Sequence, residues 1–326
     1  MSEVKKVFLE KKATLRLTSF NQSRVYGFTC QTFENDDVIN TIHYKVTIAC
    51  TYSHNNSFFF EIHRQQVYID NTAPDLKIEQ IADACSAAIF PVMVEVSWEG
   101  DIVNITNHDA IKQRWPPIKE RLSKYYEGDI VAKILHKIQD TINNKTLLAE
   151  SLCKSWFFHL YFRPLYTQYK QNEPHGSVWE SPVFGSQTIS YGVQQTVEEH
   201  YSATDKIFIN VQGNSVDKRS IEEVLNGYSY PKSEMAGIKV EPVASQMEVQ
   251  YKLYGEDHSI YSVIGTYKTA ITAKKHKTIQ VEMYHLPEDS SFRPPARGEQ
   301  KDMSSFFVAE GAPVKEKGGF WSWFKL

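Results

Sequence analysis

The sequence contains no uninterrupted apolar run long enough to cross a membrane. Residues 1–14 lack the apolar core and small-residue cleavage site of a secretory signal, and carry four lysines instead. The net charge is −3 with both signs interleaved, so no positive field attracts phosphates from a distance. We therefore expect a cytoplasmic protein that does not bind nucleic acid and is not integral to a membrane.

Cysteine is scarce, and the four residues show no CxxC spacing. Cys50 and Cys85 fall on the apolar faces of a predicted strand and a predicted helix. Buried free thiols are therefore expected, rather than disulfides or zinc ligands. The eleven histidines include no pair at i, i+2 or i, i+4 spacing, so we expect no metal and no other cofactor. A metal site assembled from distant residues is the alternative.

Catalytic motifs are missing as well. There is no G-x-S-x-G elbow, P-loop, G-x-G-x-x-G, H-E-x-x-H or EF-hand loop. An S-x-x-K pattern occurs at 151–154 and at 215–218, both times without the S-D-N and K-T-G elements that complete a penicillin-recognising site. Cys153 and His159 would lie roughly 240° apart on one helix and cannot meet. We expect a protein that is not an enzyme, and an enzyme with a site assembled from distant residues is an alternative.

What the sequence does contain is an almost perfect alternation of apolar and polar residues over 40–53, which predicts a half-buried strand. This parity places Val46 in the core and Thr47 in solvent. The turn-forming residues 54–57 and a second β-type run over 58–69 complete a hairpin. Strands over 7–17 and 25–33 are also expected.

Helical periodicity begins after Pro74 and ends at Pro91, and residues 92–105 resemble a second hairpin. Helices are then expected from 109 to 142, with breaks at Pro116-Pro117 and at Gly128. A further helix from Thr146 ends in residues 156–162, which are apolar on every side and so should be buried.

One layout resembles an uncharacterised family of β-rich bacterial proteins of unknown function. The resemblance rests on core-like positions and implies nothing about chemistry. Its residues are Glu99-Gly100-Asp101-Ile102, then Ile111, Arg114 and Trp115, then Tyr125-Tyr126-Glu127-Gly128, and finally Trp156 to Tyr166.

A turn-rich stretch over 172–182 precedes strands at 183–201 and 207–211. Ser220 and Glu223 form a capping box, and residues 247–286 form a three-stranded meander. The order predicts an α+β fold, in which antiparallel β-sheet sections from both halves of the chain join and a central helical insertion covers one face. We expect a single domain over 1–286, with a division near Gln171 as the alternative.

Aromatic residues concentrate in the predicted helix that ends at residue 162. Trp156, Phe157, Tyr161 and Phe162 are candidates for the lining of an apolar pocket that holds a lipophilic ligand. The alternative is a core helix without a ligand. A carrier of a lipophilic small molecule is therefore the first alternative function.

The end of the chain changes composition. Residues 287–318 are rich in proline, charged and small residues, which predicts a flexible linker to an aromatic docking motif over 319–326. Phe320, Trp321, Trp323 and Phe324 are expected to bind a protein partner or a second copy of the chain. The alternatives are docking onto the chain's own domain and a weak membrane contact. The leading prediction is a non-catalytic adaptor, chaperone or structural component of a larger bacterial assembly, such as a secretion or injection machine.

Overall fold

The structure is a computed structural model that describes residues 5–8, 11–18 and 23–287. Its strands are β1 (Lys12–Thr14), β2 (Arg24–Glu34), β3 (Asp37–His54), β4 (Ser57–Arg64), β5 (Tyr68–Ile69), β6 (Val92–Ser97), β7 (Ile102–Ile105), β8 (Gln168–Lys170), β9 (His175–Phe184), β10 (Gln187–Val197), β11 (Lys206–Ser215), β12 (Ser245–Tyr254), β13 (Ile260–Thr272) and β14 (Lys275–His285). Its helices are α1 (Lys77–Ile89), α2 (His108–Tyr125), α3 (Asp129–Asn143), α4 (Lys145–Cys153), α5 (Trp156–Tyr161), α6 (Ile221–Leu225) and α7 (Lys232–Met235).

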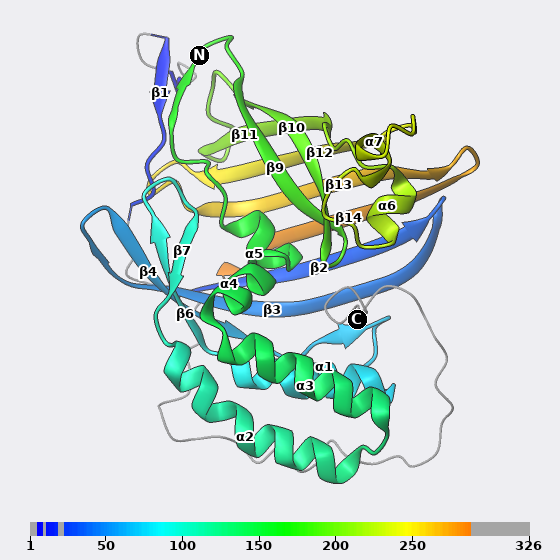
Figure 1. Cartoon of the computed structure of the whole chain (residues 1–326). Coiled ribbons are helices and arrows are strands. Elements are labelled where there is room, and N and C mark those ends of the chain that lie inside the picture. The colour runs from blue at the N-terminus through cyan, green and yellow to red at the C-terminus, as the bar shows by residue number, and fades with distance from the viewer. Residues whose placement is uncertain (1–4, 9–10, 19–22, 288–326) are drawn as a thin grey trace.

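A large antiparallel sheet dominates the fold, which confirms the β-rich prediction. Within the described ranges it has twelve strands in the order β7-β6-β4-β3-β2-β14-β13-β12-β11-β10-β9, with β5 paired to β3. The strands β2 and β14 lie side by side, in register from Tyr26 opposite His285 to Glu34 opposite Lys277 (Figure 1). Strands from the beginning and the end of the described chain therefore meet in the middle of one sheet.

The predicted hairpins form where the turn residues accept left-handed backbone conformations. Asn55 and Asn56, between β3 and β4, have φ of 47° and 64°. Asparagine tolerates such angles better than most residues. The hairpin of β6 and β7 and the meander of β12, β13 and β14 are also present as predicted.

The sheet curves around α5, while α1, α2 and α3 group together at one side (Figure 1). Aromatic side chains join α5 to the inner face of the sheet. The Phe157 ring centroid lies 5.8 Å from that of Phe28, and that of Tyr161 lies 5.2 Å from that of Tyr26. Because these side chains are large and buried, they fix α5 inside the curve of the sheet.

The predicted break at Pro116-Pro117 is wrong, since α2 runs from His108 to Tyr125 through both prolines. Prolines in a helix interior each remove a backbone hydrogen bond. Tertiary contacts of neighbouring α2 residues compensate for the lost backbone hydrogen bonds. Trp115 is fully buried, and its indole N–H donates to Gln139 Oε1 at 2.8 Å. Arg114 donates to the carbonyl oxygens of Ala88, Ile89 and Pro91 and ties α2 to the end of α1.

Two further boundaries differ from prediction. Residues 175–184, expected to be mostly turn, form β9, because they pair with β10 along their length. The helix expected from Thr146 to 162 is divided into α4 and α5 at Lys154 and Ser155, where the Ser155 hydroxyl donates to the Leu152 carbonyl. Long-range pairing and a local side-chain bond outweighed the composition of these segments.

The solvent position predicted for Thr47 is wrong. Val46 is buried as expected, but Thr47 is 0% exposed on the opposite face of β3. Thr47 pairs with Val25, which is also buried, and the amide of Leu286 donates to the Val25 carbonyl at 2.7 Å. The Leu286 side chain lies over Gly27 on the same face. Alternation predicted the parity of β3 correctly, but both faces of the sheet are covered at this point.

Replacing Thr47 with valine should raise the free energy of unfolding by about 1 kcal/mol. The Thr47 hydroxyl is buried and has no hydrogen-bond partner in the described part of the chain, so an isosteric methyl group removes a desolvation cost. Urea denaturation measures the change. Thr51→Val is the control, because the exposed Thr51 hydroxyl donates to the Phe59 carbonyl and its loss brings no gain. A less stable Thr47→Val protein would show that the hydroxyl is satisfied.

All four thiols are free, as expected, although burial varies. Cys30 and Cys85 are buried, Cys50 is half-buried, and Cys153 is exposed. The expectation of burial is therefore correct for two of the four and wrong for Cys153, which lies at the end of α4.

Candidate functional site

The sequence-predicted site residues fall into three groups. Phe320, Trp321, Trp323 and Phe324 lie outside the described residues, so the docking motif stays a prediction. Trp156 lines a cavity on the inner face of the sheet. Phe157, Tyr161 and Phe162 are buried in the core. The Phe162 ring meets the Phe60 ring edge-on, with 5.9 Å between the ring centroids.

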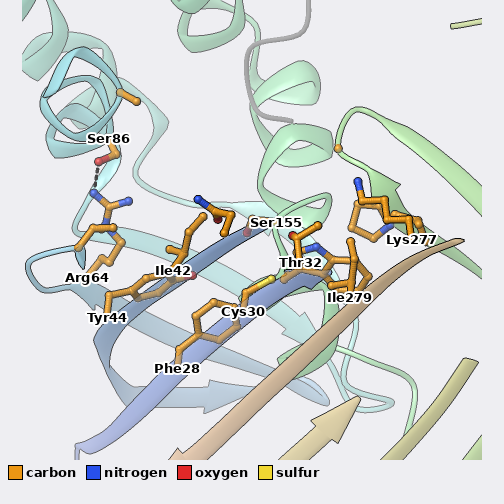
Figure 2. Close-up of a pocket in the computed structure, with 17 residues that line it drawn as sticks. Phe28, Cys30, Thr32, Ile42, Tyr44, Arg64, Ser86, Ser155, Lys277 and Ile279 are labelled. Carbon is orange, nitrogen blue, oxygen red and sulfur yellow. Dashed lines mark hydrogen bonds between the residues drawn. The ribbon is translucent and has the colours of Figure 1, made fainter. Parts of the chain in front are cut away.

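The cavity beside Trp156, here called the sheet cavity, has a volume of about 100 Å³. Its floor comes from β2, β3 and β14, and it is closed by residues of α1, the start of α5 and the end of β9. Figure 2 shows Phe28, Cys30, Ile42, Tyr44 and Ile279 along this floor. The cavity therefore runs across neighbouring strands rather than between two domains.

Apolar side chains on this floor are not fully covered. Ile42, Tyr44 and Trp156 face the inner side of the sheet, yet each is only half-buried. Inward-facing apolar residues are normally packed to crystal-like density. Partial exposure here means that α1 and α5 leave apolar surface available to a guest molecule.

Two polar side chains lie beside the apolar floor, at facing positions of β2 and β3. Thr32 and Asn40 pair across the two strands and are each 7% exposed. Within the described ranges, neither side chain has a hydrogen-bond partner. Buried polar groups nearly always have partners, so these two offer donors and acceptors to an occupant of the cavity.

Arg64, at the end of β4, closes one end of the sheet cavity. Its Nη2 donates to the hydroxyl of Ser86 on α1 (Figure 2). The same nitrogen donates to Asp83 Oδ1 on that helix at 2.6 Å. The guanidinium also lies over the rings of Tyr44 and Phe90, at 5.8 and 5.5 Å from their centroids. Burial lowers the pKa of Arg64 and raises the pKa of Asp83, and each charge opposes the shift of the other.

A second cavity lies on the other side of Arg64, and we call it the helix cavity. Its volume is about 270 Å³, and it is lined by Gln80, Asp83, Phe90 and Arg121, among others. Arg64 and Ser86 line both cavities. The bonds from Arg64 to α1 therefore form the partition between them.

The other end of the sheet cavity carries Lys277 (Figure 2). Its ammonium lies 4.8 Å from the ring centroid of Phe184. Burial raises the pKa of the Cys30 thiol to about 12, so Cys30 is a neutral part of the floor. Among the described residues that line the sheet cavity there are two cations and no carboxylate, which makes its electrostatic character positive.

A serine–histidine pair lies elsewhere in the core. His159 Nε2 is 3.0 Å from Ser181 Oγ, and Arg163 donates to the same imidazole. Burial and the neighbouring Arg163 hold the pKa of His159 well below its usual range. A general base for serine needs a group that stabilises the protonated imidazole, and here a cation stands in that place. Ser181 is also fully buried, so this pair stabilises the core.

Among the described residues, no helix is long and apolar enough to cross a membrane. The same residues contain no group of three or more histidine, cysteine, aspartate or glutamate side chains placed to hold a metal ion.

No family model matches this chain, and no curated protein matches it. Among solved structures, one described as showing lipid–protein interactions in lipovitellin is similar over 83% of this chain, with 10% sequence identity and a TM-score of 0.41. The chain spans about a quarter of the length of that protein. A likeness this low carries no argument about this chain.

Sequence reasoning missed Arg64, Asp83, Thr32 and Asn40. Asp83 gave little signal: at 3.6 residues per turn it lies away from the face of α1 that carries Ile81 and Cys85, so the sequence did not require a partner for its carboxylate. Nothing in the sequence identified Arg64 as that partner, since 18 residues and a change of element separate the two.

Proposed function

We propose that this protein binds a small lipophilic molecule in the sheet cavity. The observation that supports it is the combination of half-buried apolar side chains with the unpartnered Thr32 and Asn40 on one inward-facing surface. Ligand pockets are typically apolar with a few polar groups that orient the guest. A packed core would instead bury Ile42 and Tyr44 completely.

The proposed carrier is an α+β protein. Its sheet supplies the floor of the site, and the central helical insertion supplies the cover through α1 and the start of α5. Small residues, Ala82 and Ser86, form the side of α1 that faces the cavity. Small side chains at this position leave room that larger ones would fill.

The volumes set the size of the guest. An engineered apolar cavity of about 150 Å³ accommodates benzene. The sheet cavity alone, at about 100 Å³, suits a short chain or small ring, whereas a longer molecule would have to extend past Arg64 into the helix cavity. A single-chain molecule of medium length fits this arrangement better than a multi-chain lipid.

The adaptor function and the absence of catalysis stay predictions, as does the cytoplasmic location. The residues of the docking motif lie outside the described part of the chain, and no described contact bears on a protein partner. The two functions are compatible, because the sheet cavity and the docking motif are different parts of the chain.

Filling the sheet cavity should abolish ligand binding. Ala82→Leu places a larger side chain in the cavity, and we expect it to weaken the binding of octan-1-ol at least tenfold, as measured by isothermal titration calorimetry. Ala132→Leu, on the exposed side of α3, is the matched control and should bind octan-1-ol as the unmodified protein does. Equal affinities for all three proteins, or no binding by the unmodified protein, would overturn the proposal.

A further inference from the structure

We propose that the sheet cavity selects amphiphiles with an anionic group, that Arg64 binds this group, and that Asp83 is an internal competitor which the ligand displaces. This inference rests on the proposed function and adds the chemical class of the ligand.

Arg64 has N–H groups that make no described hydrogen bond. A guanidinium carries five N–H donors, and both described side-chain bonds of Arg64 leave from Nη2. Among the described residues, its Nε and Nη1 groups have no hydrogen-bond partner. Arg64 is half-buried, with 18% of its side chain exposed, so the unused N–H groups at the junction of the two cavities are accessible to an acceptor that enters there.

The charges around the cavities favour an anion. Arg64 and Lys277 line the sheet cavity, and Arg64 and Arg121 line the helix cavity. Asp83 is the one carboxylate among the residues that line the two cavities. A ligand carboxylate that enters beside Arg64 would therefore meet three cationic side chains and one acidic side chain among the described residues that line the two cavities.

The geometry explains how a ligand competes with Asp83. A carboxylate binds arginine most strongly by accepting from two adjacent nitrogens, here Nη1 and Nη2. Asp83 occupies only Nη2, and its side chain is 32% exposed. Asp83 can therefore turn toward water while a ligand carboxylate takes both nitrogens, with its chain on the apolar floor beside Tyr44.

The experiment compares two probes of equal chain length, octanoate and octan-1-ol, by isothermal titration calorimetry. The unmodified protein should bind octanoate about tenfold more tightly than octan-1-ol. Asp83→Asn should tighten octanoate binding about tenfold further and leave octan-1-ol binding unchanged, because it removes the competing charge. A merely structural role for the ion pair would change both ligands alike.

A second variant guards against loss of folding. Removing one member of a partly buried ion pair leaves the other charge without its partner, so Arg64→Gln is combined with Asp83→Asn. The readout is the ratio of the two affinities, and this protein should lose its preference for octanoate over octan-1-ol. Arg24→Gln with Asp257→Asn neutralises another partly buried ion pair, one that lines neither cavity, and should keep the preference.

The outcomes separate the two proposals. In one outcome, octan-1-ol binds while octanoate binds no more tightly, either to the unmodified protein or to the Asp83→Asn protein. In that case Arg64 does not bind an anionic headgroup, and the proposed lipophilic site stands without it. If neither probe binds to the unmodified protein, the proposed function fails with it.

Discussion

Replacing Gly100 with alanine should cost about 3 kcal/mol of stability or more. Gly100 turns the chain between β6 and β7 with φ of 110°, which side-chain-bearing residues rarely adopt. A Cβ atom at this position would lie 2.4 Å from the carbonyl oxygen of Arg163 and 2.9 Å from the ring of Tyr166. The amide of Tyr166 also donates to the Glu99 carbonyl, so the two segments cannot separate freely.

Gly128→Ala is the matched control for this substitution. Gly128, before α3, has a similar φ of 119°, but no atom lies within 4 Å of its ideal Cβ position. Alanine there should cost about 1 kcal/mol from backbone strain alone. Urea denaturation of both variants separates strain from collision, and equal losses would show that the contact of Gly100 with residues 163–166 is unimportant.

Mild acid should destabilise the protein through two histidines, the buried His159 and the half-buried His285. Burial, followed by Arg163, holds the pKa of His159 well below its usual range, and burial, followed by Arg24, lowers the pKa of His285 to about 4. The unfolded chain therefore binds protons near pH 6.5, whereas the folded chain does not. The stabilisation contributed by the two neutral histidines is fully present above pH 6.5 and is lost as the pH drops toward 4. Between pH 7 and pH 5, the half-buried His285 should remove about 1 kcal/mol of the free energy of unfolding once solvent screening is allowed for, and His159 adds to the loss.

Glutamine substitutions test the assignment. Gln at 159 keeps a hydrogen-bonding group opposite Ser181 but cannot be protonated, so the fall in stability between pH 7 and pH 5 should become shallower. His285→Gln should act in the same way and additively, and the exposed His136 provides the control in His136→Gln. If the free energy of unfolding of the His159→Gln protein depends on pH in the same way as that of the unmodified protein, His159 does not cause the loss of stability in acid.

Much of the secondary structure followed from local pattern. Alternation over 40–53 and over the 247–286 region predicted strands, and Asn55-Asn56 predicted the turn between β3 and β4. The capping box predicted from Ser220 and Glu223 is present at the start of α6. These features depend on neighbours only a few residues away, which a sequence displays directly.

The site was less accessible to such reasoning. The aromatic cluster predicted that Trp156 lies at a cavity. Phe157, Tyr161 and Phe162 instead point into the core, because only one side of a helix can face a given cavity. The polar residues that give the cavity its character come from β2, β3, β4 and α1. Each looks ordinary in its own segment.

By itself, then, the sequence determined where strands and helices form, which side of most strands faces the core, and that α5 is buried. The tertiary structure alone decided that β9 is a strand, that α2 continues through Pro116 and Pro117, and that Thr47 is buried on the outer face of β3. It alone brought Arg64 to Asp83 and Ser86, and it alone placed Arg64, Thr32 and Asn40 in the lining of one cavity. The reason is physical: periodicity reports the two faces of a single element, whereas the curvature and pairing of the sheet determine which distant elements cover each face.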